Sequence, residues 1–348
     1  MEKVVRVLVV DDSAYIRKVI KQMLSRNPLI EVVGIARDGK EALELVEQLH
    51  PDVVTTDLIM PTMNGVEFLR EQMKRCPVPT IVVSITDENT EMALEALDAG
   101  AVDFVQKPTA LATEKVLEIS DELIQKVQAA TNVRLPKLAT IPTSRATVSP
   151  LVRTRNKLRA VDIVVIGIST GGPQALNFLI PQLPQNLSVP VAIVLHMPVG
   201  YTQMYADRLN EISPLKVIEA QEGDVVEAGV VLIAPAGRHL SFIRQANGTV
   251  VTHLDFRPFD MLHRPAVDVL FQSTAEVFGD RVLGVVMTGM GSDGKKGAAW
   301  IKAQGGLIFT EAESTCVVYG MPRSVDEADL SDKSVPLNQM ATAILEVL

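Results

Sequence analysis

Hydrophobic positions between residues 4 and 128 follow two alternating patterns. Short runs of β-branched residues predict strands, and the stretches between them repeat Leu, Val and Ile every three or four positions, as amphipathic helices do. The predicted strands cover residues 5–10, 31–36, 52–57, 80–85 and 103–108, and the predicted helices cover residues 14–24, 40–49, 66–74 and 91–99. This alternation predicts an α/β domain with a parallel sheet covered on both faces.

A second alternation begins at Val161. Its predicted strands cover residues 161–168, 189–195, 229–234, 281–287 and 306–310, and its predicted helices cover residues 175–183, 201–212, 266–278 and 295–304. A second, mostly parallel α/β sheet is therefore expected. Between residues 238 and 252 the pattern changes to simple alternation with a turn at Asn247-Gly248, which predicts a small antiparallel hairpin.

The segment between the two alternations has a composition of its own. It is rich in Pro, Thr, Ser and Ala, carries several Lys and Arg residues without any acidic residue, and shows no periodicity after Val127. We predict a basic linker over residues 126–158, between domains at 1–125 and 159–348. The linker is either a solvated tether or a basic surface for a partner.

Length and composition agree with two globular domains. The chain has 348 residues, a formal net charge of -9 and 4% aromatic residues, which argues against nucleic acid as a partner. Cys76 and Cys316 are far apart, as expected of free thiols in a reducing compartment. The sequence lacks a signal-peptide pattern and an apolar run of about 20 residues, so we expect a cytoplasmic protein without membrane insertion.

Polar residues stand at the ends of four predicted strands in the first domain. Asp11 and Asp12 follow the first strand, Asp57 ends the third, Ser84 ends the fourth and Lys107 ends the fifth. A single Asp at such a position is usually a turn former. Because these strand ends meet at one edge of a parallel sheet, the set instead predicts an Mg²⁺ site with a hydroxyl and an ammonium for a phosphoryl group on a carboxylate.

The motifs DD at residues 11–12, DLIMP at 57–61 and KP at 107–108 resemble those of response-regulator receiver domains. The resemblance implies a flavodoxin-like (βα)5 fold. It also implies that a histidine kinase phosphorylates Asp57, which holds Mg²⁺ together with Asp11 and Asp12. Lys107 would then contact the phosphoryl group, and Ser84 would sense it.

A glycine-rich turn, GISTGGP at residues 167–173, follows the first strand of the second domain. It could cradle a phosphate at a helix N-terminus, but the G-x-G-x-x-G order and a following ribose-binding carboxylate are lacking. It also satisfies G-x-S-x-G, with Ser169 as an exposed nucleophile beside backbone N–H groups. The nucleotide site is the weaker of the two alternatives.

A base and an orienting acid for Ser169 are available downstream. His196 directly follows the next buried strand, a placement that His239, His253 and His263 lack. Asp293 lies in a glycine-rich loop before a helix, where Asp is also common as a turn or cap residue. In α/β-hydrolases the acid precedes the histidine, so this order disfavours an ordinary lipase or esterase fold.

Four segments resemble the catalytic domain of chemotaxis protein-glutamate methylesterases: GISTGGP, HMP at residues 196–198, HRPAVDVLF at 263–271 and MTGMGSDG at 287–294. The resemblance implies a doubly wound hydrolytic domain without a cofactor. The implied activity is hydrolysis of glutamate γ-methyl esters on chemoreceptor cytoplasmic helices, with release of methanol, and deamidation of receptor glutamines. Met290 would supply an oxyanion N–H, and Thr170 would lie beside it.

The same resemblance implies that a chemotaxis histidine kinase is the phosphodonor and that the protein is a monomer. The unphosphorylated receiver would pack on the esterase face, and phosphorylation would loosen this contact. Two other classes are weaker alternatives. One is a receiver joined to a binding module, and the other is a transcriptional regulator, for which the second half lacks a basic helix-turn-helix.

Overall fold

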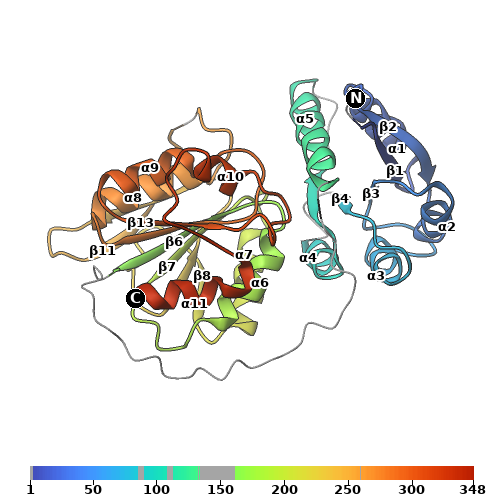
Figure 1. Cartoon of the computed structure of the whole chain (residues 1–348). Helices are drawn as coiled ribbons and strands as arrows, with labels where there is room; N and C mark the ends of the chain where they lie inside the picture. The colour runs from blue at the N-terminus through green and yellow to red at the C-terminus, as the bar shows by residue number, and fades with distance from the viewer. Residues whose placement is uncertain (1–2, 85–89, 108–112, 132, 134–160, 259) are drawn as a thin grey trace.

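The computed structural model describes residues 3–84, 90–107, 113–131, 133, 161–258 and 260–348. Figure 1 shows two α/β domains lying side by side. The first contains a five-stranded parallel sheet in the order β2-β1-β3-β4-β5. Its strands are β1 (Val5–Val10), β2 (Ile30–Ala36), β3 (Val53–Thr56), β4 (Thr80–Ser84) and β5 (Asp103–Gln106).

The helices of the first domain are α1 (Ala14–Leu24), α2 (Gly39–Leu49), α3 (Gly65–Arg75), α4 (Thr90–Asp98) and α5 (Thr113–Ala130). Polar side chains begin several of them. Ser13 caps α1, Asp38 caps α2, and Asn64 forms a capping box with Glu67 on α3, which satisfies backbone N–H groups that have no helical acceptor. The predicted five-unit α/β fold is confirmed.

The second domain contains a seven-stranded sheet in the order β14-β13-β12-β6-β7-β9-β8, in which every pair is parallel. Its strands are β6 (Ile163–Ile168), β7 (Val191–Leu195), β8 (Lys216–Glu219), β9 (Val230–Ile233), β12 (Val282–Val286), β13 (Leu307–Glu311) and β14 (Lys333–Val335). The predicted hairpin is confirmed as the antiparallel pair β10 (His239–Arg244) and β11 (Val250–Asp255).

The helical segments of the second domain are α6 (Gly172–Leu179), η1 (Ile180–Gln182), α7 (Thr202–Ile212), α8 (Val267–Phe278), α9 (Lys295–Ala303), α10 (Met321–Asp326) and α11 (Leu337–Val347). The edge strands β8 and β14 are additions to the predicted elements. Both are short and partly exposed, so their sequences lack a long apolar run.

Helix α5 continues past residue 125, the predicted end of the receiver domain, to Ala130. Lys126 is therefore a helical residue with ion pairs to Asp103 and Glu122. Most of the predicted linker, from residue 134 to its end at residue 158, lies outside the described residues.

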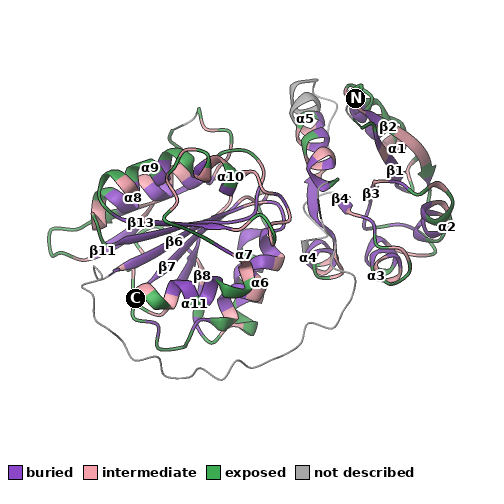
Figure 2. Cartoon of the chain, viewed as in Figure 1, coloured by how far each residue is buried: buried purple, intermediate pink, exposed green. Residues whose placement is uncertain are grey.

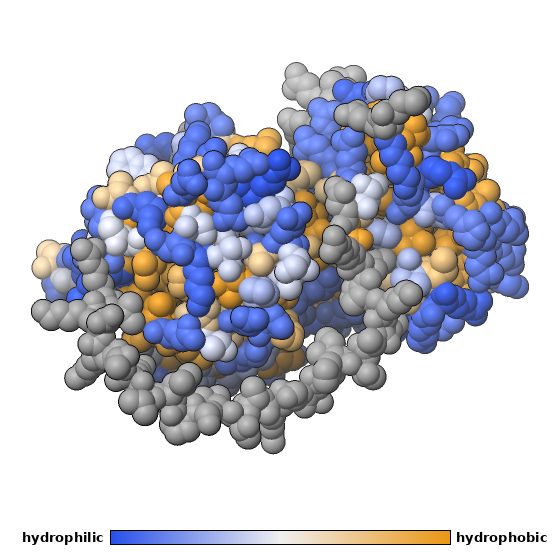
Figure 3. Space-filling model, in the orientation of Figure 1, coloured by the Kyte–Doolittle hydropathy of each residue, from blue (hydrophilic) through white to orange (hydrophobic). Residues whose placement is uncertain are grey.

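Buried residues fill the inner strands of both sheets, while exposed residues lie on the outer faces of the helices (Figure 2). The face seen in Figure 3 is mainly hydrophilic, with hydrophobic residues between the hydrophilic ones. One hydrophobic cluster includes residues of both domains, and the rings of Phe104 in β5 and Tyr201 before α7 stack at 4.8 Å. Within the described part of the chain, no helix is long and apolar enough to cross a membrane.

Candidate active site and phosphorylation site

Four of the five polar residues predicted at the strand ends of the first domain meet in one cluster. Carboxylate oxygens of Asp11, Asp12 and Asp57 lie within 4.8 Å of one another. Lys107 Nζ lies 2.7 Å from Asp11 Oδ2 and 2.6 Å from Asp57 Oδ2. Ser84 is buried, and its Oγ has no hydrogen-bond partner among the described residues.

The three carboxylates of this cluster bring negative charges close together, and two of them, Asp11 and Asp57, are buried. Burial raises the pKa of Asp57 and the charge of Asp11 raises it further, while Lys107 opposes both. Oxygen ligands that crowd in this way suit a hard cation, so the residues present fit Mg²⁺. The spare hydroxyl of Ser84 and the ammonium of Lys107 are the partners that a phosphoryl group on Asp57 would need.

The glycine-rich turn of the second domain follows β6, the central strand of the larger sheet. Ser169 directly follows β6, and its N–H donates to the carbonyl of Thr288, 3.0 Å away, in the loop after β12. Strand order reverses between β6 and β12, so the turn occupies the switch point where open α/β sheets bind ligands. Ser169 is partly exposed, as a nucleophile must be.

His196 lies on the neighbouring strand and contacts the predicted acid. It directly follows β7, and its backbone N–H donates to the carbonyl of Ile168 at 3.2 Å. This bond ties the backbone of the histidine to that of the serine turn. His196 Nε2 lies 2.9 Å from Asp293 Oδ2. His196 Nδ1 is buried and has no hydrogen-bond partner among the described residues.

Asp293 is held at the N-terminus of α8. Its Oδ2 accepts the N–H of Val267 at 2.8 Å, and its Oδ1 accepts the N–H of Asp268 at 2.9 Å. Burial alone would raise the pKa of Asp293, but the bond to His196 and these backbone donors outweigh burial and lower it. Asp293 therefore stays ionised beside the imidazole.

The loop after β12 approaches the serine closely. A side-chain carbon on Gly289 would lie 2.8 Å from Ser169 Cβ, so only glycine fits there. The next residue, Met290, has a backbone N–H for which the described residues offer no hydrogen-bond acceptor. An N–H of this kind is available to a substrate oxygen.

The other histidines differ in ways that the sequence pattern did not reveal. His263 stacks on His196 with ring centroids 4.0 Å apart. Burial lowers the pKa of His263 to about 4, and the charge of His196 contributes to the shift. The strand-end criterion missed His263. Its place at the head of the HRPAVDVLF motif was the available signal.

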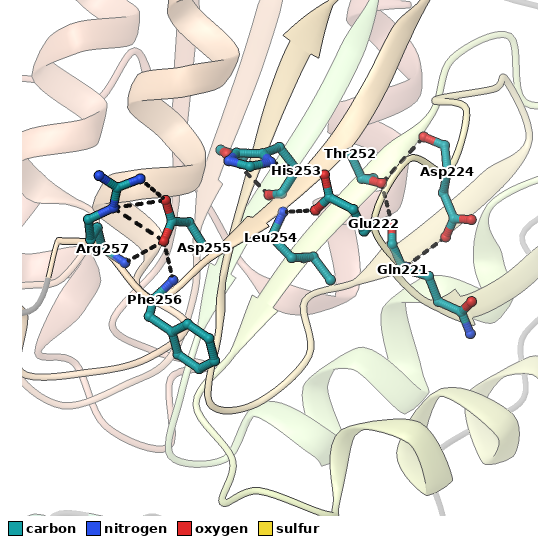
Figure 4. Close-up of polar contacts among 10 residues, drawn as sticks. Gln221, Glu222, Asp224, Thr252, His253, Leu254, Asp255, Phe256 and Arg257 are labelled. Carbon is teal, nitrogen blue, oxygen red and sulfur yellow. Dashed lines mark hydrogen bonds and ion pairs between the residues drawn. The ribbon is translucent and has the colours of Figure 1, made fainter.

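His239 and His253 belong to the structural framework. His239 Nδ1 accepts the N–H of Ala266 at 3.2 Å, and its Nε2 lies 3.1 Å from the carbonyl oxygen of Pro258. His253 is on β11, where its Nδ1 pairs with Glu222 at 3.0 Å in an exposed polar group (Figure 4).

The first domain reaches the serine turn directly. Thr170 Oγ1, beside the candidate nucleophile, donates to Asp103 Oδ2 at 2.5 Å, and Lys126 Nζ binds Asp103 Oδ1 at 3.1 Å. Gln174 in α6 donates to the carbonyls of Leu97 and Ala101 at 3.0 and 2.8 Å. The end of α4 and the residues that follow it thus contact α6, and the start of β5 contacts the serine turn.

Comparison with known families matches a separate family to each of the two domains. Residues 7–118 match the response regulator receiver domain, and residues 164–344 match the CheB methylesterase. A receiver domain joined to a hydrolytic α/β domain defines the class of protein. The chain belongs to the CheB methylesterase family and is a carboxylic ester hydrolase.

Relatives match along the whole chain. The protein-glutamate methylesterase/protein-glutamine glutaminase 5 of Myxococcus xanthus is 48% identical over 97% of this chain and 96% of its own length. The protein-glutamate methylesterase/protein-glutamine glutaminase of Pyrococcus abyssi is 41% identical over 99% of this chain and 94% of its own length. The crystal structure of the Thermotoga maritima CheB methylesterase catalytic domain, 42% identical, aligns over 54% of this chain and 100% of that chain with a TM-score of 0.53.

Proposed function

We propose that the protein hydrolyses glutamate γ-methyl esters on the cytoplasmic helices of chemoreceptors, with release of methanol, and deamidates receptor glutamines by the same chemistry. It would act in the cytoplasm as a monomer. The observation that carries the proposal is the contact between His196 Nε2 and Asp293, which leaves Nδ1 as a buried, unpaired base on the strand next to Ser169.

The reaction follows from these groups. Asp293 accepts a hydrogen bond from Nε2–H, so the lone pair of His196 lies on Nδ1, which takes the proton of Ser169 as the serine oxygen attacks the ester carbonyl. The imidazolium then protonates the leaving methoxide, and methanol departs. Water, deprotonated by the same nitrogen, cleaves the acyl-serine and restores the free carboxylate.

Charge on the carbonyl oxygen needs donors that are already in place. The backbone N–H of Met290 is unpaired within the described residues and lies in the loop that packs on Ser169. A preorganised donor of this kind contributes about 3 kcal/mol to the stability of the transition state. Thr170 directly follows the serine, and its hydroxyl would be free to face the substrate once Asp103 leaves.

Replacement of the nucleophile tests the activity. Ser169→Ala should abolish methanol release from a peptide that carries a glutamate γ-methyl ester, and it should abolish labelling by a fluorophosphonate probe. Ser188→Ala, an exposed serine of the same domain, is the matched control and should behave as the unmodified protein does. Methanol release at the unmodified rate by Ser169→Ala would exclude the proposed chemistry.

We also propose that phosphorylation of Asp57 by a chemotaxis histidine kinase activates the esterase. The supporting geometry is the contact between Asp103 and Thr170, in which the receiver places a carboxylate beside the nucleophile. Asp11, Asp12 and Asp57 would hold Mg²⁺, which neutralises the phosphoryl charge during transfer. Ser84 and Lys107 would bind the phosphoryl group, and their movement would favour the arrangement in which the domains separate.

A small phosphodonor tests this control. In the presence of Mg²⁺ it should raise methanol release by the full chain, and Asp57→Asn should remove the response while basal activity remains. Asp121→Asn, an exposed carboxylate of α5, is the control and should still respond. Truncation before Leu158 should give a constitutively active fragment. A folded but inactive fragment would argue against inhibition by the receiver.

A further inference from the structure

A fully buried carboxyl group lies behind the serine site and takes no part in the proposed reaction. Glu311 ends β13 with 0% of its surface exposed. Its Oε2 accepts the N–H of Thr288 at 2.9 Å, and its Oε1 has no hydrogen-bond partner among the described residues. Burial raises the pKa of Glu311, against the backbone N–H of Thr288 and the nearby side chains of Thr315 and Cys316.

Burial of a carboxyl group whose second oxygen has no partner lowers the free energy of unfolding, so we expect Glu311 to serve another purpose in the domain. Its partner, Thr288, joins two segments of the site. The Thr288 carbonyl accepts the N–H of Ser169 at 3.0 Å, and its Oγ1 donates to the carbonyl of Thr170 at 2.9 Å. The same Oγ1 accepts the N–H of Val318 at 3.0 Å. Thr288 thus binds two backbone groups of the serine turn, the N–H of Ser169 and the carbonyl of Thr170.

The residues that follow Thr288 face the reacting atoms. Gly289 packs against Ser169 so closely that a side chain would not fit, and Met290 carries the unpaired N–H. The separation between the serine oxygen and this N–H therefore depends on where Thr288 lies. Thr288 is held from the side of the sheet by the carboxyl group of Glu311.

We propose that Glu311 and Thr288 are positioning residues, which together set the distance between Ser169 and the oxyanion donor in the loop after β12. This inference rests on the proposed esterase function. Neither side chain contacts the substrate. Glu311 holds the loop through an N–H, and Thr288 ties the loop to the serine turn through its hydroxyl and carbonyl groups.

Four variants of the full chain, assayed with phosphodonor and Mg²⁺, test the proposal. Thr288→Val removes the hydroxyl at nearly constant volume, and Glu311→Met removes the acceptor. Each should lower kcat about tenfold or more and leave KM within about twofold, because a small displacement of an oxyanion donor affects the transition state most. Thr288→Ser and Glu311→Gln keep the hydroxyl and the acceptor, and should restore kcat to within about threefold.

A matched control separates positioning from stability. Thr310, adjacent to Glu311 in β13, is also fully buried, and its hydroxyl bonds to Asp326 and Ser331 on a different part of the domain. Thr310→Val should lower Tm and leave kcat unchanged. If Glu311→Met fails to fold, Thr288→Val carries the test.

Two outcomes would overturn the inference. One is an unchanged kcat in Thr288→Val and Glu311→Met. The other is a loss of activity in all variants, Thr310→Val included, in proportion to the loss of stability. Both outcomes leave the esterase proposal standing so long as the unmodified chain releases methanol and Ser169→Ala does not. Failure of the esterase proposal would instead appear as methanol release by Ser169→Ala.

Discussion

The candidate sites of the two domains lie at the same position of similar parallel sheets, but one is lined by charged side chains and the other by hydroxyl and backbone groups. In the first domain β1 and β3 lead into Asp11 and Asp57, which a lysine bridges. In the second, β6 and β12 lead into Ser169 and Thr288, which offer hydroxyl and backbone groups. Both pairs of strands flank the point where strand order reverses.

The difference fits the groups that we propose for the two sites, a phosphoryl group in the first and an ester in the second. A phosphoryl group is multiply charged, so its site gathers an ammonium and carboxylates that can bind a cation. An ester is neutral and gains charge only in the transition state, so fixed dipoles serve it better than full charges. The charged Asp293 is set back behind His196, on the N-terminus of α8. Topology decides where a site lies, and the residues at the strand ends decide its chemistry.

The largest expected effect comes from removing the proposed base of the second site. His196→Gln keeps a polar side chain but not a titratable nitrogen, and should lower kcat by about a thousandfold or more. Methanol release under phosphodonor activation is the measurement. His253→Gln, which changes an exposed imidazole paired with Glu222, is the control and should keep full activity. Equal methanol release by His196→Gln and His253→Gln would contradict the role of His196 as the base.

A smaller effect is expected where the two sites communicate. Asp103→Ala removes the acceptor of the Thr170 hydroxyl and leaves Lys126 with one fewer partner. Loss of a buried hydrogen bond to a charged group should shift the domains toward separation, and basal activity of the unphosphorylated chain should rise about tenfold. Asp121→Ala, on the same helix as Lys126 but paired with Arg26, should leave basal activity unchanged. An unchanged basal rate in Asp103→Ala would mean that this contact does not restrain the enzyme.

The smallest effect concerns pH and the histidine stacked on the base. The pKa of His263 is lowered from 6.5 to about 4 in the folded chain, so the unfolded chain takes up a proton first as pH falls. The contribution of this group to stability is complete above pH 6.5 and is lost as pH falls toward 4. Between pH 7 and 5.5 the loss is about 1 kcal/mol.

His263→Phe keeps an aromatic ring against His196 and removes the titration. Urea unfolding at several pH values should therefore show a shallower acid loss of stability in this variant than in the unmodified chain. Identical slopes for His263→Phe and the unmodified chain would show that His263 titrates normally.

Much of the molecule could be predicted from local pattern. Apolar runs of β-branched residues marked the central strands of both sheets, because a strand buried on both faces must be apolar throughout. Strand-end positions then brought Asp11, Asp57 and Lys107 into one predicted site, which the geometry matches. The edge strands β8 and β14 escaped prediction, since half-exposed strands carry little of this signal.

The sequence by itself determined two α/β domains, their order and the residues whose chemistry could serve each site. Only the tertiary structure decided which groups touch. The stacking of His263 on His196, the hold of α8 on Asp293 and the bond from Thr170 to Asp103 join positions distant in the chain. Periodicity reports which face of an element is buried, whereas contacts between elements depend on packing that no local pattern encodes.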